Sequence, residues 1–189
     1  MTRCPWPADN DLMIRYHDAE WGTPVHDDLV HFEFLILESA QAGLNWLTIL
    51  KKREGYRAAY RGFDAKRVAR FGARDVERLL KDPGIVRNRA KIASSINNAK
   101  RFLEVQNEFG SFDGYIWKWV NGRPLPGNRK TLSEIPPRSP LSDAVSKDLK
   151  ERGFTFVGST IVYAHLQATG IVNDHIMGCF RWRELKGSR

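Results

Sequence analysis

The sequence contains little cysteine and no long hydrophobic run. Its 189 residues include two cysteines, Cys4 and Cys179, near opposite ends of the chain, so a disulfide-rich secreted scaffold is excluded. No stretch of 18 apolar residues occurs, which argues against a transmembrane helix. The opening residues, MTRCPWPADN, lack the apolar segment of a signal peptide. We therefore expect a soluble, cytoplasmic protein without a disulfide and without a membrane partner.

Alternating strand patterns, internal repeats and low-complexity tracts are also missing. Apolar periodicity and capping residues predict a succession of helices instead. Five of the nine prolines fall within 121–140, which predicts a long and mobile surface connection. A chain of this length can bury one sizeable core, so we predict a single all-α domain over residues 1–189. Helices are expected at 9–18, 28–42, 45–60, 64–71, 73–82, 88–108, 111–120, 142–152 (capped by Ser142) and 159–169.

Acidic residues are outnumbered by basic ones, 22 against 30, which gives a formal net charge of +8. This balance favours an anionic partner, nucleic acid first, and six tryptophans on a basic chain fit base recognition. Phosphate contact would make binding weaken steeply with salt, whereas a merely solvated basic face would not. The range 76–102 holds the cations that are expected to lack acidic partners: Arg87, Arg89, Lys91, Lys100 and Arg101.

The helix expected at 28–42 carries a carboxylate, Glu38, near its far end. Its apolar residues leave no clean polar face, so the helix should be buried nearly all round. Asp27 or Asp28 can cap its start, and Gly43 is a plausible stop. A desolvated carboxylate has a raised pKa unless hydrogen bonds or a cation keep it ionised. The alternative is that Glu38 extends to the surface or pairs with an arginine.

A metal site is suggested by residues at the two ends of the chain. His175 and Cys179 are four apart, which would place both on one face of a helical turn. Cys4 and His17 would complete a tetrahedral zinc set with no open position, if the termini meet. The alternative is a group of unrelated Cys and His residues. The remaining histidines, 26, 31 and 165, stand alone in the sequence, which suits solvent or core roles.

Residues 142–170 are typical of two helices joined by a tight glycine turn. Gly158, followed by Ser159 and Thr160, leaves free amide groups at a helix start, where a phosphate can bind without side-chain charge. Many helix pairs turn on glycine, so an ordinary structural turn is the alternative.

Taken together, eight segments resemble the 3-methyladenine DNA glycosylase I family, a branch of the helix-hairpin-helix glycosylase superfamily. They cover nearly the whole chain in order: Cys4, YHDAEWG (16–22), ESAQAGLNW (38–46), KKREGYR (51–57), DPGIVRNRAKI (82–92), TLSEIP (131–136), KERGFTFVG (150–158) and VNDHIMGC (172–179). The resemblance implies two helical lobes around a cleft. It also implies a monomeric enzyme that excises 3-methyladenine from alkylated double-stranded DNA.

Residue roles follow from the same resemblance. The zinc ligands would be Cys4, His17, His175 and Cys179, joining the two ends of the chain. The base pocket would contain Glu38 as the catalytic candidate, with Tyr16 and Trp46 binding the base. Leu44 would fill the space left by the flipped nucleotide, with Gln41 and Gly43 beside it. The phosphate-binding hairpin would turn at 152–158.

One departure from the wider superfamily concerns its catalytic aspartate, which follows the hairpin helix in a pattern like V-D-x-H. Asn173 occupies that position here, and the carboxylate moves to Asp174, a departure that the 3-methyladenine family shares. We expect Asp174 to orient His175 or the backbone. No lysine nucleophile is evident nearby, so a monofunctional enzyme without a lyase step is expected. The basic tail, 181–189, suggests no role.

These residue types suit the chemistry of a methylated purine. Methylation at ring position 3 makes adenine a cation and a good leaving group, so selecting and extracting the lesion is the harder task. The indole of Trp46 offers cation–π attraction of ~1–2 kcal/mol to such a ring. An ionised Glu38 can accept a hydrogen bond from the exocyclic amine, and Tyr16 can add another. Whether Glu38 also acts in catalysis stays open.

Other interpretations remain at this point. Tyr16 and Trp46 could be ordinary core residues, and Trp6 and Trp21 could form a pocket wall or pack around the metal. The chain could be a zinc-stapled DNA- or RNA-binding module that recognises damaged duplex without chemistry. It could also be a glycosylase for 3-methylguanine or a deaminated base.

Overall fold

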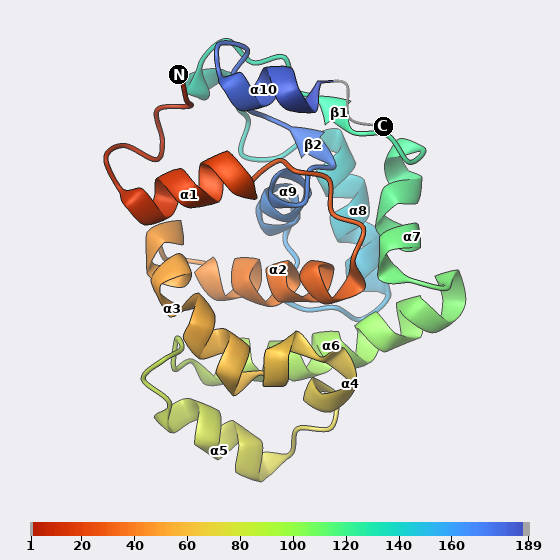
Figure 1. Cartoon of the computed structure of the whole chain (residues 1–189). Coiled ribbons are helices and arrows are strands. Elements are labelled where there is room, and N and C mark those ends of the chain that lie inside the picture. Colours follow the sequence, from red (N-terminus) through yellow and green to blue (C-terminus); the bar gives the residue numbers. More distant parts are fainter. Residues whose placement is uncertain (1, 187–189) are drawn as a thin grey trace.

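The computed structural model describes residues 2–186 and is mainly helical, as predicted (Figure 1). The last three residues of the basic tail, 187–189, lie outside the described range. No helix among the described residues has the length and apolar character needed to cross a membrane. The elements are α1 (Asp11–Ala19), α2 (Asp28–Gln41), α3 (Trp46–Ala59), η1 (Arg61–Phe63), α4 (Ala65–Val68), α5 (Ala73–Lys81), α6 (Arg89–Phe109), α7 (Phe112–Trp117), η2 (Lys118–Val120), β1 (Leu125–Pro126), η3 (Leu132–Glu134), α8 (Pro140–Glu151), α9 (Ser159–Ala168), β2 (Val172–Asn173) and α10 (Phe180–Leu185).

Helix α2 crosses the middle of the molecule and packs against α3, α6, α7 and α9 (Figure 1). Every residue from His31 to Ala40 is buried, which confirms the predicted all-round burial. Asp27 is the N-cap and accepts a hydrogen bond of 2.7 Å from the Leu29 amide. Asp28 instead accepts from the amides of Phe112 and Asp113, and so ties the start of α7 to α2.

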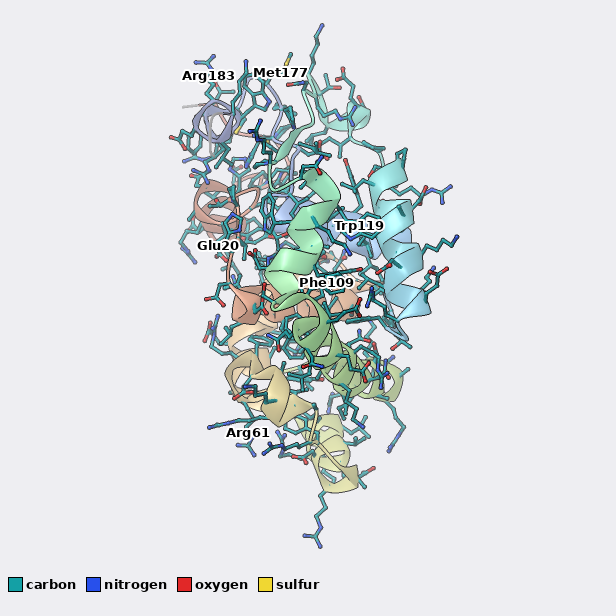
Figure 2. All side chains as sticks on the ribbon, turned by 90° about the vertical axis from the view of Figure 1, so that its right-hand side faces the viewer. Glu20, Arg61, Phe109, Trp119, Met177 and Arg183 are labelled. Atoms are coloured by element: carbon teal, nitrogen blue, oxygen red, sulfur yellow. The ribbon has the colours of Figure 1, made fainter. Side chains whose placement is uncertain are left out.

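The remaining helices gather on the two sides of α2. Helices α3 to α6 lie on one side, and α1, α8, α9 and α10 lie on the other (Figure 1). The rotated view places Met177 and Arg183 at one end of the molecule and Arg61 toward the opposite end, with Phe109 between (Figure 2). The amide of Phe180 donates to the carbonyl of Thr2 at 3.0 Å, so the two ends of the described chain meet.

The helix at 142–152 begins earlier than the sequence predicts, because its N-cap is Ser139 and not Ser142. The Ser139 hydroxyl accepts from the Ser142 amide at 3.1 Å, and the Ser142 hydroxyl accepts from the Ser139 amide at 2.9 Å. Pro140 occupies the first helical position, where its fixed φ favours the helix and its missing N–H costs nothing.

The proline-rich connection contains structure that the sequence did not predict. Strand β1 pairs in parallel with β2, joining Leu125 to Val172 and Pro126 to Asn173. A further hydrogen bond of 2.7 Å runs from the Met177 amide to the Arg129 carbonyl. The connection at 121–140 is therefore held to the segment that follows α9. A pair two residues long carries no alternating pattern, so it cannot be recognised from the sequence.

Candidate active site and metal centre

A cavity of about 230 Å³ opens between α1, α2, α3 and α9. Its walls combine aromatic side chains with a carboxylate and two amides. They are formed by Trp6, Met13, Tyr16, Trp21, Glu38, Gln41, Trp46, Ala164 and Gln167. The three residues assigned to the base pocket from the resemblance, Tyr16, Glu38 and Trp46, are thus brought together.

The aromatic residues form a continuous wall. The ring centroids of Tyr16 and Trp46 are 5.4 Å apart, and those of Trp6 and Trp21 are 5.2 Å apart. Trp6 also contacts Tyr16, at 6.3 Å between centroids. Trp46 stacks at 6.5 Å on Phe34 of the buried helix, so its indole is supported by the core. Such an arrangement offers flat, polarisable faces to a planar ring.

Glu38 is the acidic residue among those that line this cavity, and it is only 4 % exposed. Burial raises the pKa of its carboxyl from 4.5 to about 8. The described residues offer it no ion pair and no hydrogen bond, so pairing with an arginine is ruled out there. Arg53 of α3 binds Glu33 at 2.7 Å. Burial, assisted by the Glu38 charge, also raises the pKa of Tyr16 well above its usual value.

The residues after α2 form an exposed apolar tip beside the cavity. Gly43 adopts φ +79°, and Leu44 is 39 % exposed. The Gln41 amide donates to the Leu44 carbonyl at 3.0 Å, while the Lys91 ammonium donates to the carbonyls of Ala40 and Ala42. Lys91 therefore satisfies the end of the helix, where a cation is favoured by the helix dipole. The tip is fixed from both sides.

The prediction that five cations lack acidic partners is wrong for two of them. Arg89 pairs with Glu77 at 2.9 Å, and Arg101 pairs with Glu104 at 2.8 Å. Both acids were present in the sequence, but only the packing of α5 on α6 brings Glu77 within reach of Arg89. Of these five cations, Arg87, Lys91 and Lys100 have no ion pair within residues 2–186.

The hairpin is present as predicted, with α8 and α9 packed against each other. Gly158 is the N-cap of α9 and provides no side chain to its amide groups. The turn is tied to α6, because Asn98 and Thr155 exchange hydrogen bonds of 2.8 and 2.9 Å. It is also tied to α2 through the Ser39 hydroxyl, which donates to the Phe156 carbonyl at 3.2 Å. The hairpin and the Glu38 helix are therefore one rigid unit.

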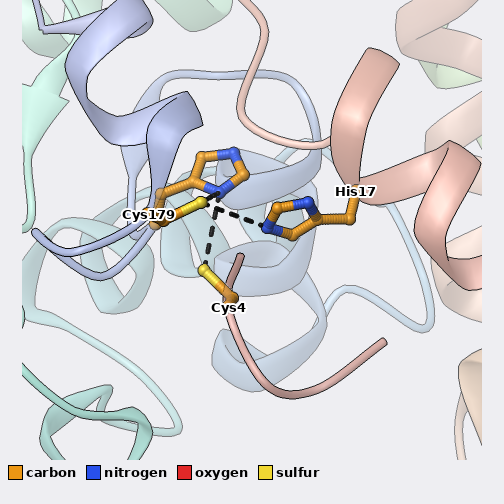
Figure 3. A group of neighbouring side chains, drawn as sticks. Cys4, His17 and Cys179 are labelled. Atoms are coloured by element: carbon orange, nitrogen blue, oxygen red, sulfur yellow. Dashed lines mark hydrogen bonds between the residues drawn. The ribbon is translucent and has the colours of Figure 1, made fainter. Parts of the chain in front are cut away.

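The four predicted zinc ligands meet in a buried cluster, whose side chains converge in Figure 3. Their ligand atoms all lie within 4.8 Å of one another. Sγ of Cys179 is 3.5 Å from Nε2 of His17 and 3.7 Å from Nδ1 of His175, and the latter is 3.6 Å from Sγ of Cys4. Sulfur and nitrogen ligands of a tetrahedral zinc ion are about 3.6 Å apart. The donor set and its spacing fit that ion.

The second nitrogen of each histidine in the cluster has its own partner. Nδ1 of His17 lies 2.7 Å from the Asp18 carboxylate, and Nε2 of His175 lies 2.8 Å from the Trp21 carbonyl. These contacts orient the rings so that the other nitrogen faces the sulfurs, as is usual for metal-binding histidines. Because Tyr16 and His17 are consecutive, α1 serves the cavity and the cluster at once.

The segment from His175 to Cys179 is not the helical turn that its spacing suggested, because α10 begins only at Phe180. The segment is instead a turn, in which the Cys179 amide donates to the Ile176 carbonyl at 2.8 Å. The Ile176 amide donates to Sγ of Cys4 at 3.4 Å. Contacts with the N-terminal segment therefore set this conformation. The spacing of His175 and Cys179 in the sequence cannot indicate such contacts.

Within residues 2–186, the Asp174 carboxylate binds neither the His175 ring nor a backbone group, so the expectation that it orients one of them is wrong. Its carboxylate accepts from the hydroxyl of Tyr163 and, at 2.8 Å, from the amide of Gln167. Asn173 is buried as well, and its side-chain oxygen accepts from the His175 amide at 3.3 Å.

The remaining histidines are structural, although two of them are neighbours. His31 and His165 lie in the core with ring centroids 5.6 Å apart, and burial lowers the pKa of His165 to about 3. His26 is exposed and binds Asp113 at 3.0 Å. Solvent and core roles are therefore confirmed.

Three residues of the cavity were missed from the sequence: Met13, Ala164 and Gln167. Ala164 and Gln167 belong to α9, one turn apart on the face toward α2. The helical period could place them together, but only the packing of α9 on α2 places that face at the cavity.

Comparisons with known proteins show which family this chain resembles over nearly its whole length. A model of the methyladenine glycosylase family matches residues 6–182. DNA-3-methyladenine glycosylase 1 of Escherichia coli (strain K12) is 49% identical over 95% of this chain and 96% of its own length. A crystal structure of 3-methyladenine DNA glycosylase I superposes with a TM-score of 0.92 at 49% identity, over 95% of this chain and 98% of that one. A structure of the Staphylococcus aureus enzyme, solved for the basis of its 3-methyladenine recognition, gives a TM-score of 0.93 at 35% identity, over 100% and 98%. This chain therefore belongs to the methyladenine glycosylase family.

Proposed function

We propose that this chain is a base-excision repair enzyme that hydrolyses the N-glycosidic bond of 3-methyladenine in alkylated DNA. The observation that carries the proposal is the cavity in which a buried carboxylate, Glu38, lies beside the aromatic rings of Tyr16 and Trp46. The related enzyme from Staphylococcus aureus recognises 3-methyladenine. A binding module without chemistry would have no use for an unpaired buried carboxylate.

The damaged base supplies much of its own reactivity, because the methylated adenine is a cation before its bond to the sugar breaks. Trp46 stacks on the flipped ring, and cation–π attraction adds about 1–2 kcal/mol in a desolvated site. Glu38 accepts a hydrogen bond from the exocyclic amine and neutralises the ring charge, and Tyr16 holds the base edge. Water then attacks the sugar carbon. No lysine is among the residues that line the cavity in the described chain, which supports a monofunctional enzyme without a lyase step.

The function is tested by incubating methylated duplex DNA with the protein and identifying the released base by chromatography. Release of free 3-methyladenine, with an intact abasic strand left behind, is the expected result. Tight binding to the methylated duplex without release would favour the zinc-stapled binding module. Release of a deaminated base in preference to 3-methyladenine would favour a different glycosylase.

Leu44 is the DNA wedge in this proposal, with Gln41 and Gly43 holding the tip in place. Replacing Leu44 by alanine should slow excision from duplex DNA by about tenfold or more, because inserting an apolar side chain offsets a few kcal/mol of unstacking. Excision from single-stranded DNA should change much less. The measurement is single-turnover release from both substrates.

Leu29 provides a matched control for the wedge. It is 44 % exposed and lies in the first turn of α2, at the opposite end of that helix from the tip. Leu29→Ala should excise as fast as the native protein. Equal rates for Leu44→Ala and Leu29→Ala on duplex DNA would remove Leu44 from the role of wedge.

The amides of Gly158, Ser159 and Thr160 bind a DNA phosphate in this proposal. A Cβ added at Gly158 meets nothing within 4 Å, and the backbone there (φ −61°, ψ 156°) suits any residue. The fold therefore does not require glycine at position 158. A phosphate that approaches the amides does require it, because a side chain there would stand in its way. Gly158→Ala should weaken binding to duplex DNA by about three- to tenfold at low salt and reduce the salt dependence.

Gly72 is the corresponding control, because it also caps a helix, α5, and its Cβ would also meet nothing within 4 Å. Gly72→Ala shares the small capping cost of alanine but should leave DNA affinity unchanged. Binding is measured by fluorescence anisotropy with an abasic duplex at several salt concentrations. If the two variants bind alike, the hairpin has only a structural role.

The zinc clip is also part of this proposal. Cys4, His17, His175 and Cys179 would hold one ion, which supplies a cross-link between the two ends of the chain and has no open position for catalysis. We further propose a two-lobed helix-hairpin-helix fold and a monomer that acts on double-stranded DNA in the cytoplasm. The net charge of +8 supports an extended polyanionic partner.

A further inference from the structure

Asp174 is fully buried and is connected to the base cavity through Gln167. Its Oδ2 accepts from the Tyr163 hydroxyl and from Nε2 of Gln167 at 2.8 Å, and Nε of Arg129 lies 3.7 Å from Oδ1. Gly127 packs so closely that a Cβ there would clash with Oδ1. The carboxylate is thus fixed from several sides, and one of its partners, Gln167, lines the base cavity.

This contact decides which way the Gln167 amide faces. Nε2 of Gln167 is the atom that donates to Oδ2 of Asp174, at 2.8 Å, so the NH₂ group of the amide points toward Asp174. The carbonyl oxygen, Oε1, is then on the other side of the amide. Within residues 2–186, this oxygen has no hydrogen-bond partner and is not among the buried unpaired atoms. It is therefore an accessible acceptor on a residue that lines the cavity.

The cavity consequently offers two acceptors, the Glu38 carboxylate and the Gln167 carbonyl. Adenine carries a donor, the amine at ring position 6, whereas guanine carries an acceptor oxygen at the same position. Two acceptors facing an acceptor leave polar groups unpaired in a desolvated site, which is costly. A cavity built in this way discriminates between the two purines by their hydrogen bonding.

We propose that Gln167 is a specificity-determining residue whose Oε1 accepts a hydrogen bond from the exocyclic amine of the damaged adenine. Asp174 is the positioning residue that holds the Gln167 amide in this orientation. Together they favour methyladenine over methylguanine. This inference deepens the proposed function and rests on it.

The test compares the release of 3-methyladenine and 3-methylguanine from the same methylated DNA. Gln167→Met keeps the length of the side chain but removes the acceptor, so the ratio of the two rates should fall by about tenfold. Asp174→Asn should lower the same ratio, because an asparagine amide can both donate and accept, which frees the Gln167 amide to turn its NH₂ group toward the base. Thermal unfolding of each variant establishes that it is folded.

Gln106 offers a matched control, since its amide donates to the Asp28 carboxylate at 2.6 Å, in the same kind of pair away from the cavity. Gln106→Met should leave the ratio unchanged. An unchanged ratio in Gln167→Met, with both rates reduced equally or not at all, would overturn the inference and leave the proposed function intact. Failure of the native protein to release any methylated base would overturn both. If Asp174→Asn does not fold, the result for Gln167→Met decides.

Discussion

Removing the proposed zinc ion from the Cys4–His17–His175–Cys179 cluster is expected to lower the unfolding temperature by more than about 10 °C, since structural zinc supplies on the order of 10 kcal/mol or more of folding energy. The cluster brings Cys4 and Cys179 together, so an ion bound there would close a loop of nearly the whole chain. Without it, the two sulfurs and the two histidine nitrogens that face them are left buried with no ion to hold them together.

The measurement combines elemental analysis with thermal unfolding, before and after a strong chelator is added. About one zinc per chain is expected from a four-ligand site. His17→Ala should resemble the chelated protein, whereas His26→Ala, at an exposed histidine bound to Asp113, should unfold like the native protein. A mass showing Cys4 joined to Cys179 by a disulfide, or a chelator without effect on a zinc-free protein, would refute the clip.

Metal loss should also impair the base cavity, because its wall and the cluster share residues. Trp6 contacts the His17 ring at 5.3 Å between centroids, and Trp21 contacts the His175 ring at 4.6 Å. Both tryptophans line the cavity as well. The two tryptophans therefore line the cavity and also pack against the histidines of the Cys/His cluster.

The helices could be predicted from the sequence because their boundaries are set by nearby residues. Asn45, Asp64 and Asn88 each accept a hydrogen bond from an amide three residues ahead, so the start of each helix is determined locally. Burial of Glu38 was predictable for a similar reason, since the helix around it has no polar face. Its association with Tyr16 and Trp46 depended on the family resemblance, because no local pattern relates these three positions.

The features that were missed or mistaken depend on contacts between distant segments. Strand β1 exists only because β2 passes beside it, and the turn from His175 to Cys179 is shaped by the N-terminal segment. Arg89 finds its acid on another helix. Gln167 lacks any signal in the sequence, because its importance arises from the packing of α9 on α2 and from the carboxylate of Asp174 behind it.

Replacing Glu38 by glutamine is expected to stabilise the free protein at high pH. Burial raises the pKa of this carboxyl from 4.5 to about 8, so the native state binds a proton more tightly than the unfolded state does. Stability is therefore fully present below pH 4.5 and is lost as the pH rises toward 8. At about 1.4 kcal/mol per pKa unit, the loss at pH 8 is on the order of 4 kcal/mol. A glutamine at position 38 stays neutral, so the variant avoids this loss of stability.

Urea unfolding at pH 5 and pH 8 measures this difference. Glu38→Gln should match the native protein at the lower pH and exceed its stability at the higher one. Glu33 is the contrasting control on the same helix, because it is buried but bound by Arg53 at 2.7 Å and by Arg57 at 3.1 Å. Glu33→Gln should therefore destabilise at both pH values. A native protein as stable at pH 8 as Glu38→Gln would mean that position 38 has an ordinary pKa.

Glu38→Gln should also greatly impair excision, which separates the function of Glu38 from its cost to stability. A cationic base favours the ionised carboxylate, so binding the lesion below pH 8 expels the Glu38 proton. For the native protein, kcat/KM should rise about tenfold per pH unit from pH 6 and level off near the pKa of the free enzyme. Glu38→Gln carries no charge to match the base, so its rate should be lower by about 100-fold at pH 8 and nearly independent of pH. Single-turnover release of 3-methyladenine between pH 6 and 9 measures both. If the variant keeps the native pH profile, a group other than Glu38 titrates in the reaction. The buried carboxylate then does not bind the cationic base.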